Sequence, residues 1–172
     1  MAGAGVGCYP GSFDPPTIAH LAVAEAAARQ AGLARVELVI SRRTLGKDHL
    51  DEATVARRLA ALDAVAAARP WLGVAVSDGG LVVDIAAGYD AVVMGADKWA
   101  QVIDPAWYGG STAARDAALA RLPRVLVAPR AGVRPAGVEL LELPDHLADV
   151  SASAIRAGLP HADAWRLPDT HG

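Results

Sequence analysis

Cysteine, aromatic residues and net charge are all scarce in this chain of 172 residues. It has one cysteine, Cys8, so no internal disulfide can form and a reducing compartment such as the cytoplasm is expected. Because Cys8 lies in a short apolar run, we predict a small buried residue there and not a nucleophile. Aromatic residues make up 5% of the chain, and alanine supplies much of the 53% hydrophobic content, which favours helices with small faces packed closely on a sheet.

The balance of charge is also slight. Lys and Arg number 16 and Asp and Glu number 19, which leaves a net charge of −3 and no general basic field to attract nucleic acid. No apolar stretch is long enough to span a bilayer, and no basic segment followed by an apolar run is found near the N-terminus, so neither a membrane nor a secretory signal is expected. Local basic clusters remain able to hold a small phosphorylated ligand.

Short apolar runs alternate with helical patterns along the chain. The expected strands are 6–9, 36–40, 72–76, 90–94, 124–128 and 138–143. The expected helices are 18–31, 52–69, 81–87, 113–122 and 151–157. This alternation predicts an α/β fold, a parallel sheet with helices on both faces, in one domain over residues 1–160. Residues 161–172 are expected to form a polar C-terminal tail.

The stretch YPGSFDPPTIAH, residues 9–20, joins the first expected strand to the first expected helix. Pro10-Gly11-Ser12 ends the strand, and Asp14, with proline in the first turn, is expected to cap the helix. Free backbone N–H groups and the positive helix end would face this loop and make a seat for phosphate. Thr17 and His20 are spaced i, i+3, so we expect both side chains to point toward a bound anion.

This stretch resembles the signature G-x-F-D-P-x-[T/H]-x-G-H of the nucleotidylyltransferase superfamily. The matching residues are Gly11, Phe13, Asp14, Pro15, Thr17 and His20. Ala19 stands where the family usually has Gly, and its methyl group could reshape the place where backbone and nucleotide approach. The resemblance implies a Rossmann-like doubly wound fold, with Gly11, Ser12, Phe13 and His20 as nucleotide contacts.

A second motif, VSASAIR at residues 150–156, resembles the family's C-terminal motif I-S-S-T-x-I-R. Ser151, Ser153 and Arg156 are in register, with Ser153 in place of the usual Thr and Ala152 in place of a Ser. In the family this helix start holds the β- and γ-phosphates of ATP, which implies the same role here. Hydroxyls, free N–H groups and a planar guanidinium suit phosphate oxygens, although the motif alone would indicate only a capped helix with a surface arginine.

Four further residues are candidates by the same resemblance. Lys47, in the basic loop after the second expected strand, looks like the family's phosphate-binding lysine, and Arg58 looks like an arginine that faces the active site. A solvated loop lysine and an exposed helix arginine are the alternatives. Gly95 and Asp97, in GADKW, resemble a G-x-D segment that implies backbone approach at Gly95 and ribose binding by Asp97. The alternative is a turn in which Asp97 caps a helix.

The acceptor is the least determined part. Trp99 and Trp107 could stack on a flat pyridine ring, although such aromatics usually belong to a core or an interface. GAD-x-W and Ser-x-x-Ile-Arg resemble nicotinate mononucleotide adenylyltransferases. The N-terminal motif resembles bacterial phosphopantetheine adenylyltransferases more closely, since the nicotinate enzymes usually have His at the position of Thr17. The two ends of the chain therefore favour different acceptors.

The resemblance implies an adenylyltransferase that transfers AMP from ATP, with Mg²⁺, to nicotinate or nicotinamide mononucleotide and releases pyrophosphate. The alternatives are a phosphopantetheine adenylyltransferase, a cytidylyltransferase, and a catalytically weak nucleotide-binding regulatory module. The expected catalytic residues are His20, Thr17, Lys47 and Arg156, and the expected acceptor contacts are Thr17, Lys47, Arg58, Trp99 and Trp107. No protein metal ligands, nucleic acid or membrane are expected, and a homo-oligomer is compatible with the sequence.

Overall fold

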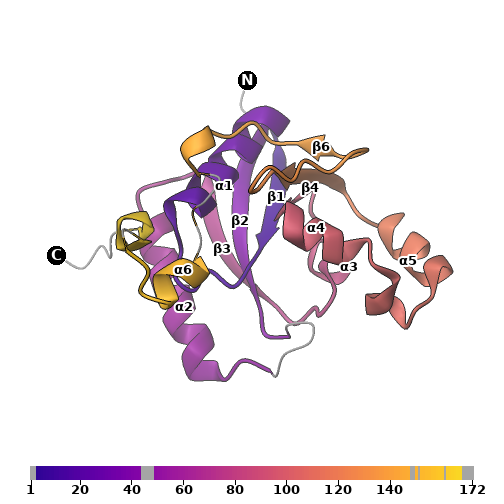
Figure 1. Ribbon diagram of the computed structural model, residues 1–172, viewed down its shortest axis with the longest axis horizontal. Coiled ribbons are helices and arrows are strands. Elements are labelled where there is room, and N and C mark those ends of the chain that lie inside the picture. The colour runs from indigo at the N-terminus through magenta and orange to yellow at the C-terminus, as the bar shows by residue number, and fades with distance from the viewer. Residues whose placement is uncertain (1–2, 44–48, 148–149, 151, 161, 168–172) are drawn as a thin grey trace.

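A six-stranded sheet runs through the middle of the computed structural model, which describes residues 3–43, 49–147, 150, 152–160 and 162–167. The strands are β1 (Gly5–Pro10), β2 (Leu33–Ser41), β3 (Leu72–Ser77), β4 (Ala91–Gly95), β5 (Arg124–Ala128) and β6 (Glu139–Leu140). They lie in the order β3-β2-β1-β4-β5-β6, and every neighbouring pair is parallel. The predicted α/β Rossmann-like sheet in a single domain is confirmed (Figure 1).

Helices connect the strands and cover both faces of the sheet (Figure 1). The α-helices are α1 (Ile18–Ala31), α2 (Glu52–Ala66), α3 (Val82–Ile85), α4 (Ala96–Val102), α5 (Thr112–Leu119) and α6 (Ala152–Arg156). The 3-10 helices are η1 (Pro105–Tyr108), η2 (Asp145–Leu147) and η3 (Ala162–Trp165). The predicted last strand, 138–143, is shorter than expected, since only β6 pairs with the sheet. None of the described helices combines the length and apolarity needed to cross a bilayer.

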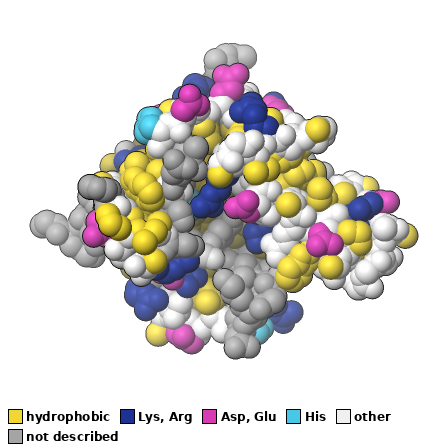
Figure 2. All heavy atoms as spheres, in the orientation of Figure 1, with side chains coloured by type: hydrophobic (Ala, Val, Ile, Leu, Met, Phe, Trp, Pro, Cys, Tyr) yellow, Lys and Arg dark blue, Asp and Glu magenta, His cyan; other side chains and the backbone are white. Residues whose placement is uncertain are grey.

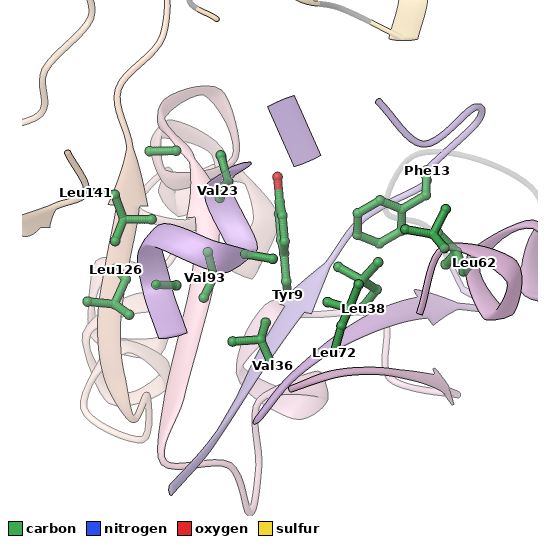
Figure 3. Packing of buried hydrophobic residues seen from close by; sticks show 14 of the residues in the cluster. Tyr9, Phe13, Val23, Val36, Leu38, Leu62, Leu72, Val93, Leu126 and Leu141 are labelled. Carbon is green, nitrogen blue, oxygen red and sulfur yellow. The ribbon is translucent and has the colours of Figure 1, made fainter. Parts of the chain in front are cut away.

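Side chains alternate between two buried clusters because successive strand residues point to opposite faces. In β4, Val93 belongs to the cluster under α1 and α2, and Val92 belongs to the cluster under α3 and α4. Figure 3 shows the first cluster, in which Tyr9 lies between Val23 on one side and Phe13 on the other. Burying one such large apolar side chain contributes roughly 1.5–3 kcal/mol, so this layer fixes the end of β1 where the site begins.

The start of α1 differs from the sequence prediction in one respect. Its N-cap is Thr17, whose hydroxyl accepts a hydrogen bond from the backbone N–H of His20, so Asp14 is not the cap. Asp14 is ion-paired with Arg58 of α2 instead. The helix ends as predicted, because Gly32 takes the left-handed conformation (φ 63°) that terminates helices.

The order of strands places the functional end of the sheet at β1. The chain runs outward from β1 through β2 to β3, and then crosses back to β4 on the other side of β1. Adjacent crossovers leave in opposite directions at this switch point, which opens a crevice beyond the carboxyl ends of β1 and β4.

The described part of the predicted tail is packed against the rest of the protein. Ala162 of η3 is 1% exposed, and Leu167 is 8% exposed within the cluster that contains Tyr9. Arg166 forms an isolated antiparallel bridge with Thr17. The composition predicted a polar tail, and Ala162 and Leu167 pack its described part against the protein. Figure 1 shows this yellow segment beside α1 and α2, away from α5.

Candidate functional site

Two cavities lie at the carboxyl end of the sheet. The larger has a volume of about 280 Å³, and it is lined by residues from the ends of β1, β4 and β5, from the start of α1 and from α6. His20 and Arg156 both line it, so the two sequence motifs meet at one space. Figure 2 shows basic and acidic side chains side by side near the middle of this face of the molecule.

The smaller cavity, of about 100 Å³, lies beyond the ends of β1 and β2. Among the described residues, those with basic side chains that line it are Arg43, Arg58 of α2 and Lys98 of α4. Ser12 lines both cavities, so the loop after β1 is a shared wall. Two adjoining spaces, each with arginine at its edge, suit two phosphorylated molecules held next to each other.

The orientation of His20 is set by its own helix start. The backbone N–H of Thr17 donates to Nδ1 of His20 over 3.0 Å, and the Thr17 hydroxyl lies 3.2 Å from the same nitrogen. A backbone N–H can only donate, so Nδ1 must be the unprotonated acceptor. The proton of a neutral imidazole is then on Nε2, which makes His20 a hydrogen-bond donor toward the larger cavity.

His20 is held in the neutral form. Burial, and to a lesser degree the positive charge of Arg130, lowers the pKa of His20 from 6.5 to about 4. Burial also raises the pKa of the neighbouring Tyr9 above its ordinary value. Around neutral pH this wall of the cavity therefore presents an N–H donor and a phenol without a formal charge.

Thr17 is placed differently from the expectation that its side chain would point toward a bound anion. It is 1% exposed, and its hydroxyl faces His20. Thr17 and His20 form a reciprocal capping box, with each side chain bonded to the backbone of the other. The geometry makes Thr17 a support for His20.

The loop between β1 and α1 is bonded to an arginine from each of the two cavities. Arg58 Nη2 lies 3.0 Å from Oδ2 of Asp14, and Arg58 Nη1 donates to the carbonyl of Ser12 over 3.4 Å. On the other side, Arg156 Nη1 donates to the Asp14 carbonyl. Arg58 therefore faces the site, as the resemblance implied, and its buried Nε has no hydrogen-bond partner among the described residues.

Gly11 and Phe13 shape this loop. A Cβ at Gly11 would lie 2.8 Å from Cζ of Phe13, so only glycine allows the Phe13 ring its position. Phe13 is 2% exposed, and its ring centroid lies 5.0 Å from that of His20 in an edge arrangement. Gly11 lines the smaller cavity and Phe13 the larger one.

The end of β4 lies at the same opening. Gly95 lines the larger cavity, and a Cβ there would meet no protein atom within 4 Å, which leaves room for close approach of a ligand. Asp97 is 74% exposed in its side chain and pairs with Arg130 over 3.6 Å. Gly95, and not Asp97, is the N-cap of α4.

Arg130 was not identified from the sequence. It lies two residues beyond the end of β5 and lines the larger cavity. The available signal was its position just beyond the carboxyl end of a strand, where ligand-binding residues gather in open parallel sheets. Lys98 was missed in the same way, because a single cation in a first turn has no distinctive spacing. Arg43 belongs to the basic loop after the second expected strand, but its place in the sequence indicated no specific role.

The two tryptophans do not join His20. Trp99 is partly buried against the cluster under α3 and α4. Trp107 lines a shallow depression on α4 and η1, which it shares with Lys98. Lys47, Ser151 and the side chain of Ser153 lie outside the described residues.

The donor set at the site is poor in metal ligands. Within the described ranges, no three His, Cys, Asp or Glu side chains are arranged to hold a metal ion. Asp14 is the one carboxylate among the described residues that line the larger cavity, and it is paired with Arg58.

A family comparison agrees with this arrangement. The model of the cytidylyltransferase-like family matches residues 8–158, most of the chain. The chain therefore belongs to the cytidylyltransferase-like family, whose members are nucleotidyltransferases. A search of curated proteins found no match.

Proposed function

We propose that this nucleotidyltransferase is an adenylyltransferase, which transfers AMP from ATP to a phosphate-ended small molecule and releases pyrophosphate. One observation carries the proposal: His20 of α1 and Arg156 of α6 line a single cavity at the switch point of the sheet. A neutral N–H donor and a guanidinium facing one space are the groups that a triphosphate requires.

In the proposed reaction a phosphate oxygen of the acceptor attacks the α-phosphorus of ATP in line. The new P–O bond forms as the bond from the α-phosphorus to the oxygen bridging to the β-phosphate breaks, and pyrophosphate leaves. Nε2–H of His20 would donate to a non-bridging oxygen of the α-phosphate, where negative charge develops. Because this imidazole is neutral, no proton has to leave it during transfer.

The triphosphate would be held by cations on the far side of the cavity. Arg156 and Arg130 both line the larger cavity, and Asp97 lies 3.6 Å from Arg130 and orients it. Ser151 and Ser153 would add hydroxyl contacts, as the family motif implies. Mg²⁺ would enter bound to the triphosphate as part of the substrate, since it keeps several waters and needs few protein ligands.

The acceptor phosphate would occupy the smaller cavity beside Arg43, Arg58 and Lys98, with Lys47 as a further contact implied by the family. Lys98 also lines the depression that contains Trp107. A pyridine mononucleotide with its phosphate near Lys98 would have its ring near Trp107. This continuity supports nicotinate or nicotinamide mononucleotide as the acceptor.

A second candidate acceptor is supported by the other walls of the smaller cavity. Ile40, Leu50, Val82 and Ile85 give it an apolar side. That side suits the aliphatic chain of phosphopantetheine better than a charged ring.

Pyrophosphate release separates these candidates. The purified chain is mixed with MgATP or MgCTP and with nicotinate mononucleotide, nicotinamide mononucleotide or phosphopantetheine, one acceptor at a time. We expect ATP with a pyridine mononucleotide to give the highest rate, and His20→Ala to abolish most of it. Nucleotide binding without release with any acceptor would contradict the proposal and support a regulatory module.

A further inference from the structure

The segment 162–167 lies outside the family match, which ends at residue 158. It nevertheless contacts Pro16 and Thr17, in the turn just before α1. The backbone N–H of Leu167 donates to the carbonyl of Pro16 over 3.3 Å, and Arg166 forms a bridge with Thr17. We call residues 162–167 the C-terminal strap.

The bond from Leu167 ends on the same peptide group that holds His20. The carbonyl of Pro16 and the N–H of Thr17 belong to one planar peptide unit. Its oxygen accepts from Leu167, and its N–H donates to Nδ1 of His20 over 3.0 Å. Because the peptide group is planar, the hydrogen bond on the Pro16 oxygen keeps the Thr17 N–H directed at the imidazole. The same hydrogen bond polarises the peptide group and strengthens the bond from the Thr17 N–H to Nδ1.

The side chain of Leu167 fixes this contact in place. It is 8% exposed and belongs to the same buried cluster as Tyr9 and Phe13, whose rings lie at the site. The strap is closed on itself as well, since the backbone N–H of Arg166 donates to the carbonyl of Asp163 over 3.1 Å. The backbone N–H of Leu167 that donates to Pro16 therefore belongs to a packed segment.

We propose that the C-terminal strap is a positioning element for His20: Leu167, through the peptide group between Pro16 and Thr17, keeps Nδ1 as the acceptor and Nε2–H aimed at the substrate. The consequence for catalysis rests on the proposed function, whereas the hold on the imidazole does not. Leu167 touches neither cavity, so it acts through His20.

The test removes one N–H and leaves the side chain. The α-hydroxy acid analogue of leucine at position 167 of the full chain replaces the amide with an ester and deletes the donor to Pro16. The matched control is the same ester at Leu159, whose N–H donates over 3.1 Å to Ala154. A simpler pair is Leu167→Ala and Leu72→Ala, because Leu72 lies in the same cluster but at the amino end of β3.

The direct measurement is ¹⁵N NMR of the imidazole, with the His20 signal assigned by its loss in His20→Gln. The native chain should show one tautomer, protonated on Nε2. The ester at 167 should mix the tautomers, whereas the ester at 159 should leave His20 protonated on Nε2 alone. The charged and titratable groups lining this cavity are Tyr9, Asp14, Arg130 and Arg156, and neither ester changes them.

Kinetics supply the second readout. The ester at 167 should lower kcat roughly tenfold while the KM for ATP changes little, because small displacements of a catalytic group act mainly on the transition state. Leu167→Met keeps an apolar side chain and the N–H, so its kcat should stay close to that of the native chain. An unchanged His20 spectrum, or a changed spectrum with unchanged kcat, would overturn the positioning role. If the native chain transfers no nucleotide, the proposed function fails and the spectrum alone decides whether the strap holds His20.

Discussion

Oδ2 of Asp14 lies 3.0 Å from Nη2 of Arg58, which ties the loop before α1 to the helix beside the smaller cavity. The carbonyl of the same aspartate accepts from Arg156 on the side of the larger cavity. One residue of the family motif thus contacts the basic groups of both spaces. The ion pair with Arg58 gives this acidic side chain a structural role even though Asp14 does not cap the helix.

Arg58→Ala should weaken acceptor binding more than nucleotide binding. Arg58 lines the smaller cavity and not the larger one. Because charge-assisted hydrogen bonds contribute about 1.5–3 kcal/mol, the KM for the acceptor should rise at least tenfold. Steady-state kinetics with each substrate varied in turn measures this. Arg57→Ala, one exposed position earlier on α2, is the control and should leave both constants unchanged. A larger effect on the KM for ATP would contradict the assignment of the two cavities.

Thr17→Val should cost both stability and turnover. The valine fills the same space but removes the hydroxyl that caps α1 and faces Nδ1 of His20, so the free energy of unfolding should fall by about 1 kcal/mol. Denaturant unfolding and kcat are the two measurements. Thr17→Ser retains the hydroxyl and should recover most of both. If the serine variant were as impaired as the valine variant, the hydroxyl would not be the reason.

The neutral state of His20 predicts a pH dependence of stability. Its pKa is about 4 in the folded protein and about 6.5 when unfolded. Between these values the unfolded chain binds the extra proton, so the free energy of unfolding should decline as pH falls from about 6.5 to about 4, by about 3 kcal/mol. Unfolding in urea at a series of pH values measures this. His20→Gln should flatten that decline, whereas His49→Gln, at an exposed position, should retain it.

Asp97→Asn should change nucleotide use without changing stability. The carboxylate is 74% exposed, and exposed ion pairs contribute less than about 1 kcal/mol, so the midpoint of thermal unfolding should not move. Loss of its charge frees Arg130 at the mouth of the larger cavity, so the KM for ATP should shift severalfold. Asp116→Asn, which removes a comparable exposed pair with Arg115 on α5, is the control. Equal kinetics for the two variants would remove Asp97 from the site.

Local patterns predicted the sheet and the first motif well. The apolar run between Pro123 and Pro129 predicted the bounds of β5, and the alanine-rich stretch that ends at Gly32 predicted the bounds of α1. The meeting of His20 and Arg156 was inferred from a family resemblance and needed the fold to bring the two segments to one cavity.

What the sequence could not predict depends on contacts between distant segments. Thr17 and Asp14 are both good capping residues. The ion pair with Arg58 takes Asp14, and Thr17 caps α1. Arg130 belongs to no motif, and its importance comes from the strand that ends beside it. Leu167 carries no motif, and its role depends on a peptide group far away in the chain.

The most direct test of the central claim is a crystal structure with Mg²⁺ and α,β-methylene-ATP, in which the bond to be broken in transfer is inert. We expect the α-phosphate within hydrogen-bond distance of Nε2 of His20, and the outer phosphates beside Arg156. A nucleotide bound with its phosphates outside this cavity, and with His20 and Arg156 untouched, would contradict the account.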